Sequence, residues 1–141
     1  MTANGQEVGT TCDLILDDIR VVDARTYQFG VRAVDAVGNV GPVQTVSLAI
    51  PDVTAPRASR RLTAVKTAAR SVKLTWRPAT DNVAVTAYQL TRNGVAIAEL
   101  TAATTTYSDT SLARGRTYRY TLTALDDAHN ASPPAKVSKT L

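Results

Sequence analysis

The chain has 141 residues, a net charge of +4, 44% hydrophobic residues and 20% charged residues. This composition is typical of a folded globular protein and excludes a disordered chain. A membrane-spanning helix needs about 20 consecutive apolar residues, and the sequence has no such run. The N-terminus lacks the basic and apolar regions of a signal peptide, so either the protein stays inside the cell or Met1 is not its natural start. The single cysteine, Cys12, excludes an intramolecular disulfide and is interpreted as a packing residue.

An internal repeat relates the first part of the chain to its last part. When the sequence is shifted by 91 positions, one segment falls on another, and the matched positions are Arg25-Thr26-Tyr27 on Arg116-Thr117-Tyr118, Phe29 on Tyr120, Ala33 on Ala124, Asp35 on Asp126, Asn39 on Asn130 and Val46-Ser47 on Val137-Ser138. The repeat predicts the same strand–loop–strand unit twice. Between the two copies, residues 51–56 carry two prolines around small polar residues and are interpreted as a short, semi-rigid linker.

From residue 60 onward, about seven short strands are predicted. Their ranges are Leu62–Lys66, Ser71–Arg77, Tyr88–Arg92, Val95–Leu100, Thr105–Asp109, Thr117–Ala124 and Lys136–Leu141. Apolar and polar residues alternate most clearly in the second and sixth of these strands, which predicts antiparallel sheets with one buried face. Asn93-Gly94 is a strong signal for a two-residue hairpin turn. Seven such strands are the number expected of a two-sheet sandwich.

Three segments together resemble a known domain family. The sequence W-R-P-A-T-D-N-V-A-V-T-A-Y runs from Trp76 to Tyr88, R-N-G follows at Arg92, and L-A-R-G-R-T-Y-R-Y runs from Leu112 to Tyr120. This pattern is similar to a fibronectin type III domain of the kind found in bacterial secreted polysaccharide-degrading enzymes and surface proteins, and it covers residues 52–141. The resemblance implies an all-β, immunoglobulin-like antiparallel sandwich of seven strands, preceded by a partial second sandwich.

The expected domain organisation follows from the repeat and the resemblance. Residues 1–50 are interpreted as the C-terminal half of a preceding module, residues 51–56 as the linker and residues 57–141 as a complete module. In the half module, Asn4-Gly5 would match the hairpin turn of the complete one. An apolar face would stay uncovered there, with candidates Val21, Tyr27, Phe29, Val31 and Ala33. Such a chain is either a truncated fragment or a half module that pairs with another chain, for example in a dimer.

The resemblance also implies structural roles for particular residues. Trp76 would anchor the core from the second strand. The hydroxyl of Tyr118 would tie down the corner before the sixth strand, and Leu112 would pack beneath it. Tyr120 and Tyr27 are interpreted as structural aromatic residues in the two copies. A buried aromatic residue of this kind contributes packing and one satisfied polar group.

The sequence gives little support to an enzyme. His129 is the only histidine, it has no Ser or Cys partner for a catalytic triad, and a turn role is expected because His tolerates left-handed backbone. Asp17-Asp18 and Asp126-Asp127 are adjacent pairs, which point to opposite faces in extended chain. Neither Cys/His metal spacing nor a phosphate-binding glycine loop occurs. The chain is therefore expected to be non-catalytic and without a cofactor.

One group of oxygen-bearing side chains could bind a cation. Asp81 and Asn82 follow the second predicted strand, while Asp126, Asp127 and Asn130 follow the sixth, and in a sandwich these two loops lie at the same end. Calcium takes such oxygen ligands. The alternative is that these side chains bond to nearby backbone and shape their own turns.

The expected function is that of a non-catalytic spacer or interaction module in a larger secreted or cell-surface bacterial protein, with neighbouring domains as its partners. One alternative is an adhesion module that binds an anionic wall polymer or glycan. Its binding surface would be the acid-free basic stretch Arg57, Arg60, Arg61, Lys66, Arg70, Lys73 and Arg77. A second alternative is a fragment of a glycoside hydrolase whose catalytic domain lies outside this chain. Nucleic-acid binding is not expected, because Trp76, the one aromatic residue within the basic stretch, is expected in the core and none is left for base stacking.

Overall fold

The computed structural model describes residues 2–3, 6–7 and 20–141. The sequence features at Asn4-Gly5, Cys12 and Asp17-Asp18 therefore lie outside the described residues. The chain divides into two compact units, Met1–Val53 and Thr54–Leu141. In the described part, no helix is long and apolar enough to cross a membrane.

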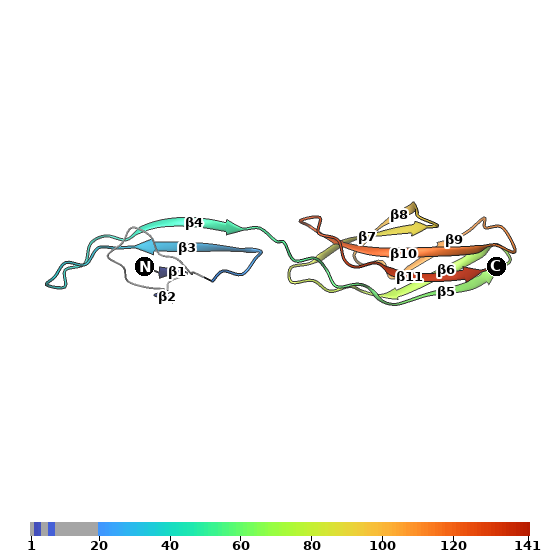
Figure 1. Cartoon of the computed structure of the whole chain (residues 1–141), viewed down its shortest axis with the longest axis horizontal. Helices are drawn as coiled ribbons and strands as arrows, with labels where there is room; N and C mark the ends of the chain where they lie inside the picture. The colour runs from blue at the N-terminus through green and yellow to red at the C-terminus, as the bar shows by residue number, and fades with distance from the viewer. Residues whose placement is uncertain (1, 4–5, 8–19) are drawn as a thin grey trace. The chain divides into compact units, whose positions relative to one another are not determined.

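The second unit is a sandwich of two antiparallel sheets (Figure 1). Its strands are β5 (Arg60–Ala68), β6 (Ser71–Arg77), β7 (Val85–Arg92), β8 (Val95–Thr101), β9 (Thr106–Asp109), β10 (Thr117–Asp126) and β11 (Ala135–Thr140). One sheet has the order β11-β10-β7-β8 and the other β5-β6-β9. The prediction of an all-β, seven-stranded sandwich is confirmed.

The alternation in the sequence explains the core between these sheets. Every second residue of β6 and β10 points inward, so that Leu74 and Tyr120 are completely buried while their neighbours Lys73 and Arg119 are exposed. Trp76 and Tyr88 meet edge to face, with ring centroids 5.8 Å apart, a favourable geometry for aromatic pairs. The buried core consists of Val72, Leu74, Trp76, Tyr88, Leu90, Leu112, Tyr120, Leu122 and Ala124.

The first unit contains one four-stranded sheet with the order β2-β1-β3-β4. Its strands are β1 (Thr2–Ala3), β2 (Gln6–Glu7), β3 (Arg25–Val31) and β4 (Gln44–Ile50). This order corresponds to β8-β7-β10-β11 of the second unit. No second sheet forms among the residues of this unit that the structure describes. The partial second sandwich that the sequence predicted is thus present as one of the two sheets.

The inner face of this sheet is apolar and open. Phe29 lies opposite Val46 across the β3–β4 ladder, and Tyr27 lies opposite Leu48, so all four side chains point to the same side. Val46 is 62% exposed and Leu48 is 49% exposed. This face is therefore open to solvent at Val46 and Leu48, although Tyr27 and Phe29 on the same face are half-buried.

Candidate functional site

The corner before β10 is held by the tyrosine that the sequence singled out. The Tyr118 hydroxyl accepts the backbone N–H of Ala113 at 2.8 Å, and Leu112 lies in the core with 2% of its surface exposed. Arg70 fastens the same corner, since its backbone oxygen accepts the Leu112 N–H at 3.0 Å and its Nε donates to the Leu112 oxygen at 2.9 Å. The structure thus places Tyr118 and Leu112 in one corner.

The first unit has the same corner. The Tyr27 hydroxyl accepts the backbone N–H of Val22 at 2.8 Å, and the Tyr27 ring stacks on Phe29 with the ring centroids 6.2 Å apart. In both units the tyrosine reaches back five residues to a backbone amide. The same hydrogen bond forms in both units because it depends only on the local course of the chain.

A buried polar network joins the two sheets of the second unit. The Tyr120 hydroxyl donates to Asp109 Oδ2 at 2.7 Å, and Arg92 Nη1 donates to both Asp109 oxygens at 2.8 and 3.0 Å. Asp109 comes from β9 in one sheet, while Arg92 and Tyr120 come from β7 and β10 in the other. Burial, and then the hydrogen bond to Asp109, raises the pKa of the Tyr120 hydroxyl. The network links the two sheets and therefore has a structural role.

Sequence reasoning missed this network, although one signal was available. Asp109 stands two residues after Tyr107 in β9, and alternate residues of a strand point to the same face. A carboxylate on the inward face needs a partner, because an unpaired buried charge is costly. The identity of that partner depends on which strands face β9 and could not be predicted from the chain itself.

The proposed cation ligands engage mainly in local turn bonds. Asp126, which is buried, accepts the backbone N–H of Asn130 at 2.7 Å and its side-chain amide at 2.8 Å. Asp81 Oδ2 accepts the Val83 N–H at 2.9 Å, while Asp81 Oδ1 is buried and has no hydrogen-bond partner among the described residues. Carboxylate oxygens of Asp81 and Asp126 lie within 4.8 Å of each other. The site at Asp81, Asn82, Asp126 and Asn130 stays a prediction.

Trp76 lies in the core and His129 lies in a turn. Trp76 is 5% exposed, and its indole N–H has no hydrogen-bond partner among the described residues, so the ring contributes apolar packing. His129 has a φ of 66°, within the left-handed region that a tight loop requires. Its backbone N–H donates to the Asp126 oxygen at 3.3 Å. The imidazole thus sits in the turn between β10 and β11.

The chain was compared with known proteins and solved structures. No family model matches the chain. It is 34% identical over 133 residues to exoglucanase B of Cellulomonas fimi, a match covering 89% of this chain and 12% of that protein. It is also 34% identical over 136 residues to chitinase A1 of Niallia circulans, covering 92% of this chain and 19% of that protein. A two-domain fibronectin type III segment from chicken tenascin matches with a TM-score of 0.55 at 12% identity, covering 82% of this chain and 65% of that segment.

The chain has the fibronectin type III fold. The resemblance seen in the sequence is confirmed. The chain spans less than a fifth of the length of the two curated enzymes with which it was compared.

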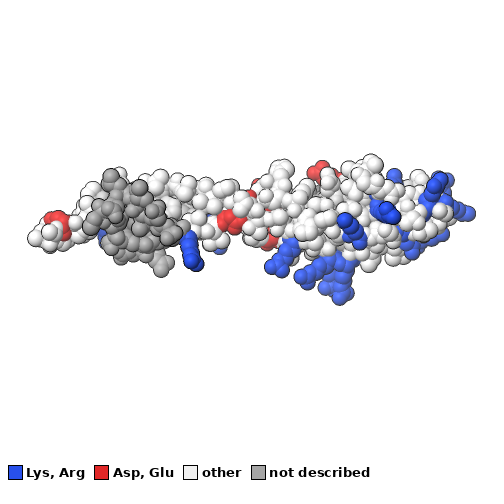
Figure 2. Space-filling view, viewed as in Figure 1, with Lys and Arg blue, Asp and Glu red and all other residues white. Residues whose placement is uncertain are grey.

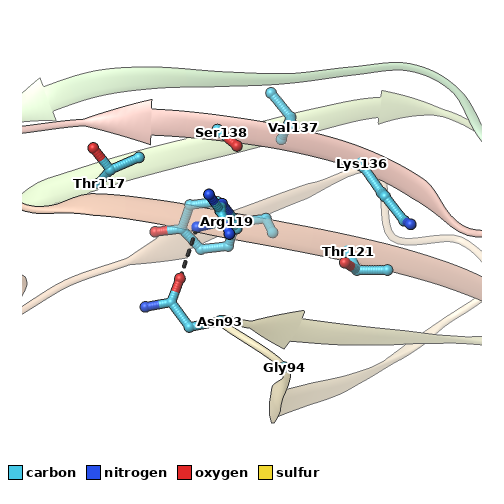
Figure 3. Close-up of a pocket in the computed structure, with 9 residues that line it drawn as sticks. Asn93, Gly94, Thr117, Arg119, Thr121, Lys136, Val137 and Ser138 are labelled. Carbon is cyan, nitrogen blue, oxygen red and sulfur yellow. Dashed lines mark hydrogen bonds between the residues drawn. The ribbon is translucent and has the colours of Figure 1, made fainter.

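A groove of the second unit lies on the outer face of β10 and β11 (Figure 3). It has a volume of about 560 Å³ and lies beside the Asn93-Gly94 turn. Asn93 Oδ1 accepts the Arg119 N–H at 2.9 Å, which holds the turn against β10. The lining residues are Asn93, Gly94, Thr117, Arg119, Tyr120, Thr121, Lys136, Val137 and Ser138. The groove offers two cations and several hydroxyl groups, and it has no exposed aromatic ring for stacking because Tyr120 is fully buried.

The basic stretch of the module separates into parts with different surroundings. Arg57, Arg60 and Arg77 line one small hollow. Arg70 is fixed to the Leu112 oxygen, and Lys73 lies along β6, opposite Ser108 of β9. The stretch that appears continuous in the sequence is therefore not one uniform surface.

Proposed function

We propose that the chain is a non-catalytic spacer and interaction module of a larger extracellular protein that degrades polysaccharide. The observation that carries this proposal is the coverage of the relatives. An exoglucanase and a chitinase each match nearly the whole chain, yet the matched stretch is only 12% and 19% of those proteins. A stretch of this size fits an accessory module beside a catalytic domain, and the location outside the cell follows from the same parent.

The second unit has the geometry of a spacer. Its chain enters at one end of the sandwich, and Leu141 lies at the opposite end (Figure 1). A rigid sandwich with its two ends apart separates whatever is attached before and after it. Separation of this kind sets the reach of one attached domain relative to the other.

The test is made on the parent protein. Removing residues 1–141 should lower hydrolysis of an insoluble polysaccharide and leave hydrolysis of a soluble oligosaccharide unchanged. Replacing them with an unrelated sandwich of equal length should restore the rate if spacing is the function. Hydrolysis by the isolated 141 residues would overturn the non-catalytic assignment, and an unchanged rate on both substrates after removal would overturn the spacer.

A second candidate function is attachment to an anionic polymer through the basic stretch from Arg57 to Arg77. The observation that favours it is the convergence of three of its arginines in one hollow. Retention of the chain on such a polymer should weaken as salt rises, because exposed charges are screened. Retention that does not change with salt would contradict it.

Dimerisation through the first unit is a further part of the proposal. It is supported by the exposure of Val31, Val46 and Leu48 on the open inner face, since apolar sheet faces are normally covered. Light scattering after size-exclusion chromatography should then show a mass that rises with concentration, and the double substitution Val46→Ser, Leu48→Ser should abolish the rise. A monomer at every concentration would remove this part of the proposal.

A further inference from the structure

Three arginines of the second unit share one hollow where this unit begins. The hollow has a volume of about 290 Å³, and its lining consists of Arg57, Ala58, Arg60, Arg77, Pro78 and Thr80. This volume corresponds to roughly ten water molecules at about 30 Å³ each. Figure 2 shows Lys and Arg side chains gathered on the lower edge of this unit. We call the hollow the three-arginine groove.

The backbone fixes the arginines in this place. Arg60 and Arg77 are direct partners in the β5–β6 ladder, so their side chains leave neighbouring strands at the same level. Arg57 comes from the segment before β5, and its N–H donates to the Thr80 oxygen at 2.8 Å. The groove is thus built from two strands and the loop that follows β6.

This arrangement is electrostatically unfavourable by itself. Like charges directly opposite each other on neighbouring strands destabilise a sheet, and Arg57 adds a third positive charge. Among the described residues, the ion pair of the second unit joins Arg92 and Asp109, and it includes none of the three arginines of the groove. Asp81 lines the adjacent hollow together with Arg57, but no ion pair forms between them. A bound anion would relieve the repulsion.

The chemistry of the side chains defines the anion. A guanidinium group is planar and presents paired donors that match carboxylate and phosphate oxygens, which a lysine does not do. All charged residues that line the groove are arginines, and the Thr80 side chain is a further polar group. We propose that the three-arginine groove binds one oxyanion group, a phosphate or a carboxylate, carried by an anionic polymer. The proposal rests on the second candidate function above and names the subsite that recognises the polymer.

The first test uses inorganic phosphate as the probe and the full 141-residue chain. Side-chain Nε–Hε signals of Arg57, Arg60 and Arg77 should shift on titration in an NMR spectrum, while that of Arg119 should not. The double substitution Arg60→Gln, Arg77→Gln should raise the phosphate concentration that gives half of the Arg57 shift at least about tenfold, because each lost hydrogen bond to a charged group weakens binding by about that factor or more. Arg119→Gln is the matched control and should leave the response unchanged. Equal shifts at Arg119 and at the groove would overturn the proposal.

The second test separates the sources of the anion. Retention is compared on polygalacturonate, which carries carboxylates, on poly(glycerol phosphate) and on neutral maltodextrin. Retention on one or both anionic polymers that falls at least about tenfold in the double variant supports the groove, and the polymer retained identifies the group. Lost retention in Lys73→Gln with full retention in the double variant would overturn the groove but keep polymer attachment. No retention of the unmodified chain would overturn both.

Discussion

The β3–β4 hairpin of the first unit and the β10–β11 hairpin of the second have the same local bonds and different surroundings. In each loop an aspartate accepts the backbone N–H of the asparagine four residues later, at 2.8 Å for Asp35 and 2.7 Å for Asp126. After each loop a backbone N–H returns to an alanine oxygen, to Ala33 at 2.8 Å and to Ala124 at 2.9 Å. Two copies 91 positions apart therefore repeat the same turn almost bond for bond.

The positions that need left-handed backbone repeat as well. Gly38 has a φ of 91° where the second copy has His129 at 66°, and Ala24 has a φ of 55° where the second copy has Gly115 at 70°. At both positions the backbone conformation persists although the residue type changes. The bonds around the turn are thus strong enough to hold a non-glycine residue in a sparsely populated region.

The two hairpins differ in burial. Leu122 is completely buried, whereas Val31, the residue 91 positions before it, is 51% exposed. Leu122 is buried because the sheet formed by β5, β6 and β9 covers the inner face of β10 in the second unit. The comparison teaches that hairpin geometry comes from local sequence, while the energy of burial comes from the opposite sheet.

The comparison is tested most strongly by paired core truncations. Leu122→Ala should destabilise the second unit by about 2–5 kcal/mol because it leaves a cavity. At concentrations where the chain is monomeric, Val31→Ala should change the stability of the first unit by no more than about 0.5 kcal/mol, since the side chain is half exposed. Urea unfolding followed by fluorescence reports the second unit, because Trp76 is the only tryptophan, and amide exchange in β3 and β4 reports the first. Equal losses at the two positions would show that the first unit is covered in solution.

A second pair of substitutions exchanges the aromatic residues. Tyr120→Phe removes the hydroxyl that donates to Asp109 and should cost about 1.5–3 kcal/mol, the range for hydrogen bonds to charged groups. Because the folded state raises the pKa of this hydroxyl, its contribution is full below pH of about 10 and is lost at higher pH. Phe29→Tyr in the first unit should change stability by less than about 0.5 kcal/mol. Urea unfolding of the unmodified chain and of Tyr120→Phe, near neutral pH and near pH 11, tests the predicted pH dependence. If Tyr120→Phe lowers the free energy of unfolding by the same amount at both pH values, that prediction is contradicted.

The tyrosine corners should respond alike, in contrast to the core positions. Tyr118→Phe and Tyr27→Phe each remove one hydrogen bond to a backbone amide, and each should cost about 0.5–1.5 kcal/mol in its own unit. Amide exchange at Ala113 and Val22 is the direct measurement, because these N–H groups lose their acceptor. Faster exchange at Ala113 alone would mean that the corner of the first unit depends on a second sheet.

The smallest expected effect concerns the loop carboxylate of the first unit. The side-chain hydrogen bond from Asn39, followed by its backbone N–H, lowers the pKa of Asp35 below its ordinary value. The charged form is favoured in the folded state, so its stabilising contribution is present above the unfolded pKa of about 3.9 and is lost as pH falls through the folded value. Carbon NMR of the Asp35 carboxyl should report the lowered pKa, and Asn39→Ala should return it toward the ordinary value. An unchanged pKa in that variant would assign the shift to the backbone bonds alone.

Much of the fold could be predicted from sequence because its signals are local. The alternation in Ser71–Arg77 matches β6 residue for residue, and the Asn93-Gly94 turn joins β7 and β8. The ends of other strands moved by a few residues; β5 begins at Arg60 rather than at Leu62. There the ladder shifts register and Arg61 adopts a positive φ of 55°. A bulge of this kind depends on the partner strand and leaves no clear alternation in the sequence.

The candidate sites were less predictable than the fold. The basic stretch was visible in the sequence, but strand pairing selects which of its members meet. Arg60 and Arg77 are separated by a whole hairpin and become direct partners, while Arg70 turns to the corner at Leu112. The network of Arg92, Asp109 and Tyr120 was missed for the same reason, since its members lie on three strands of two sheets.

The sequence by itself determined the strands, the turns, the repeat and the family resemblance, because these depend on residues close together in the chain or on a direct comparison of two segments. Only the tertiary structure decided which face is covered, which charges meet and which carboxylate is buried. The physical reason is that hydrogen bonds within a turn form between near neighbours, whereas burial and charge pairing need the second sheet to be in place. In this chain the same hairpin occurs once with that sheet and once, among the described residues, without it.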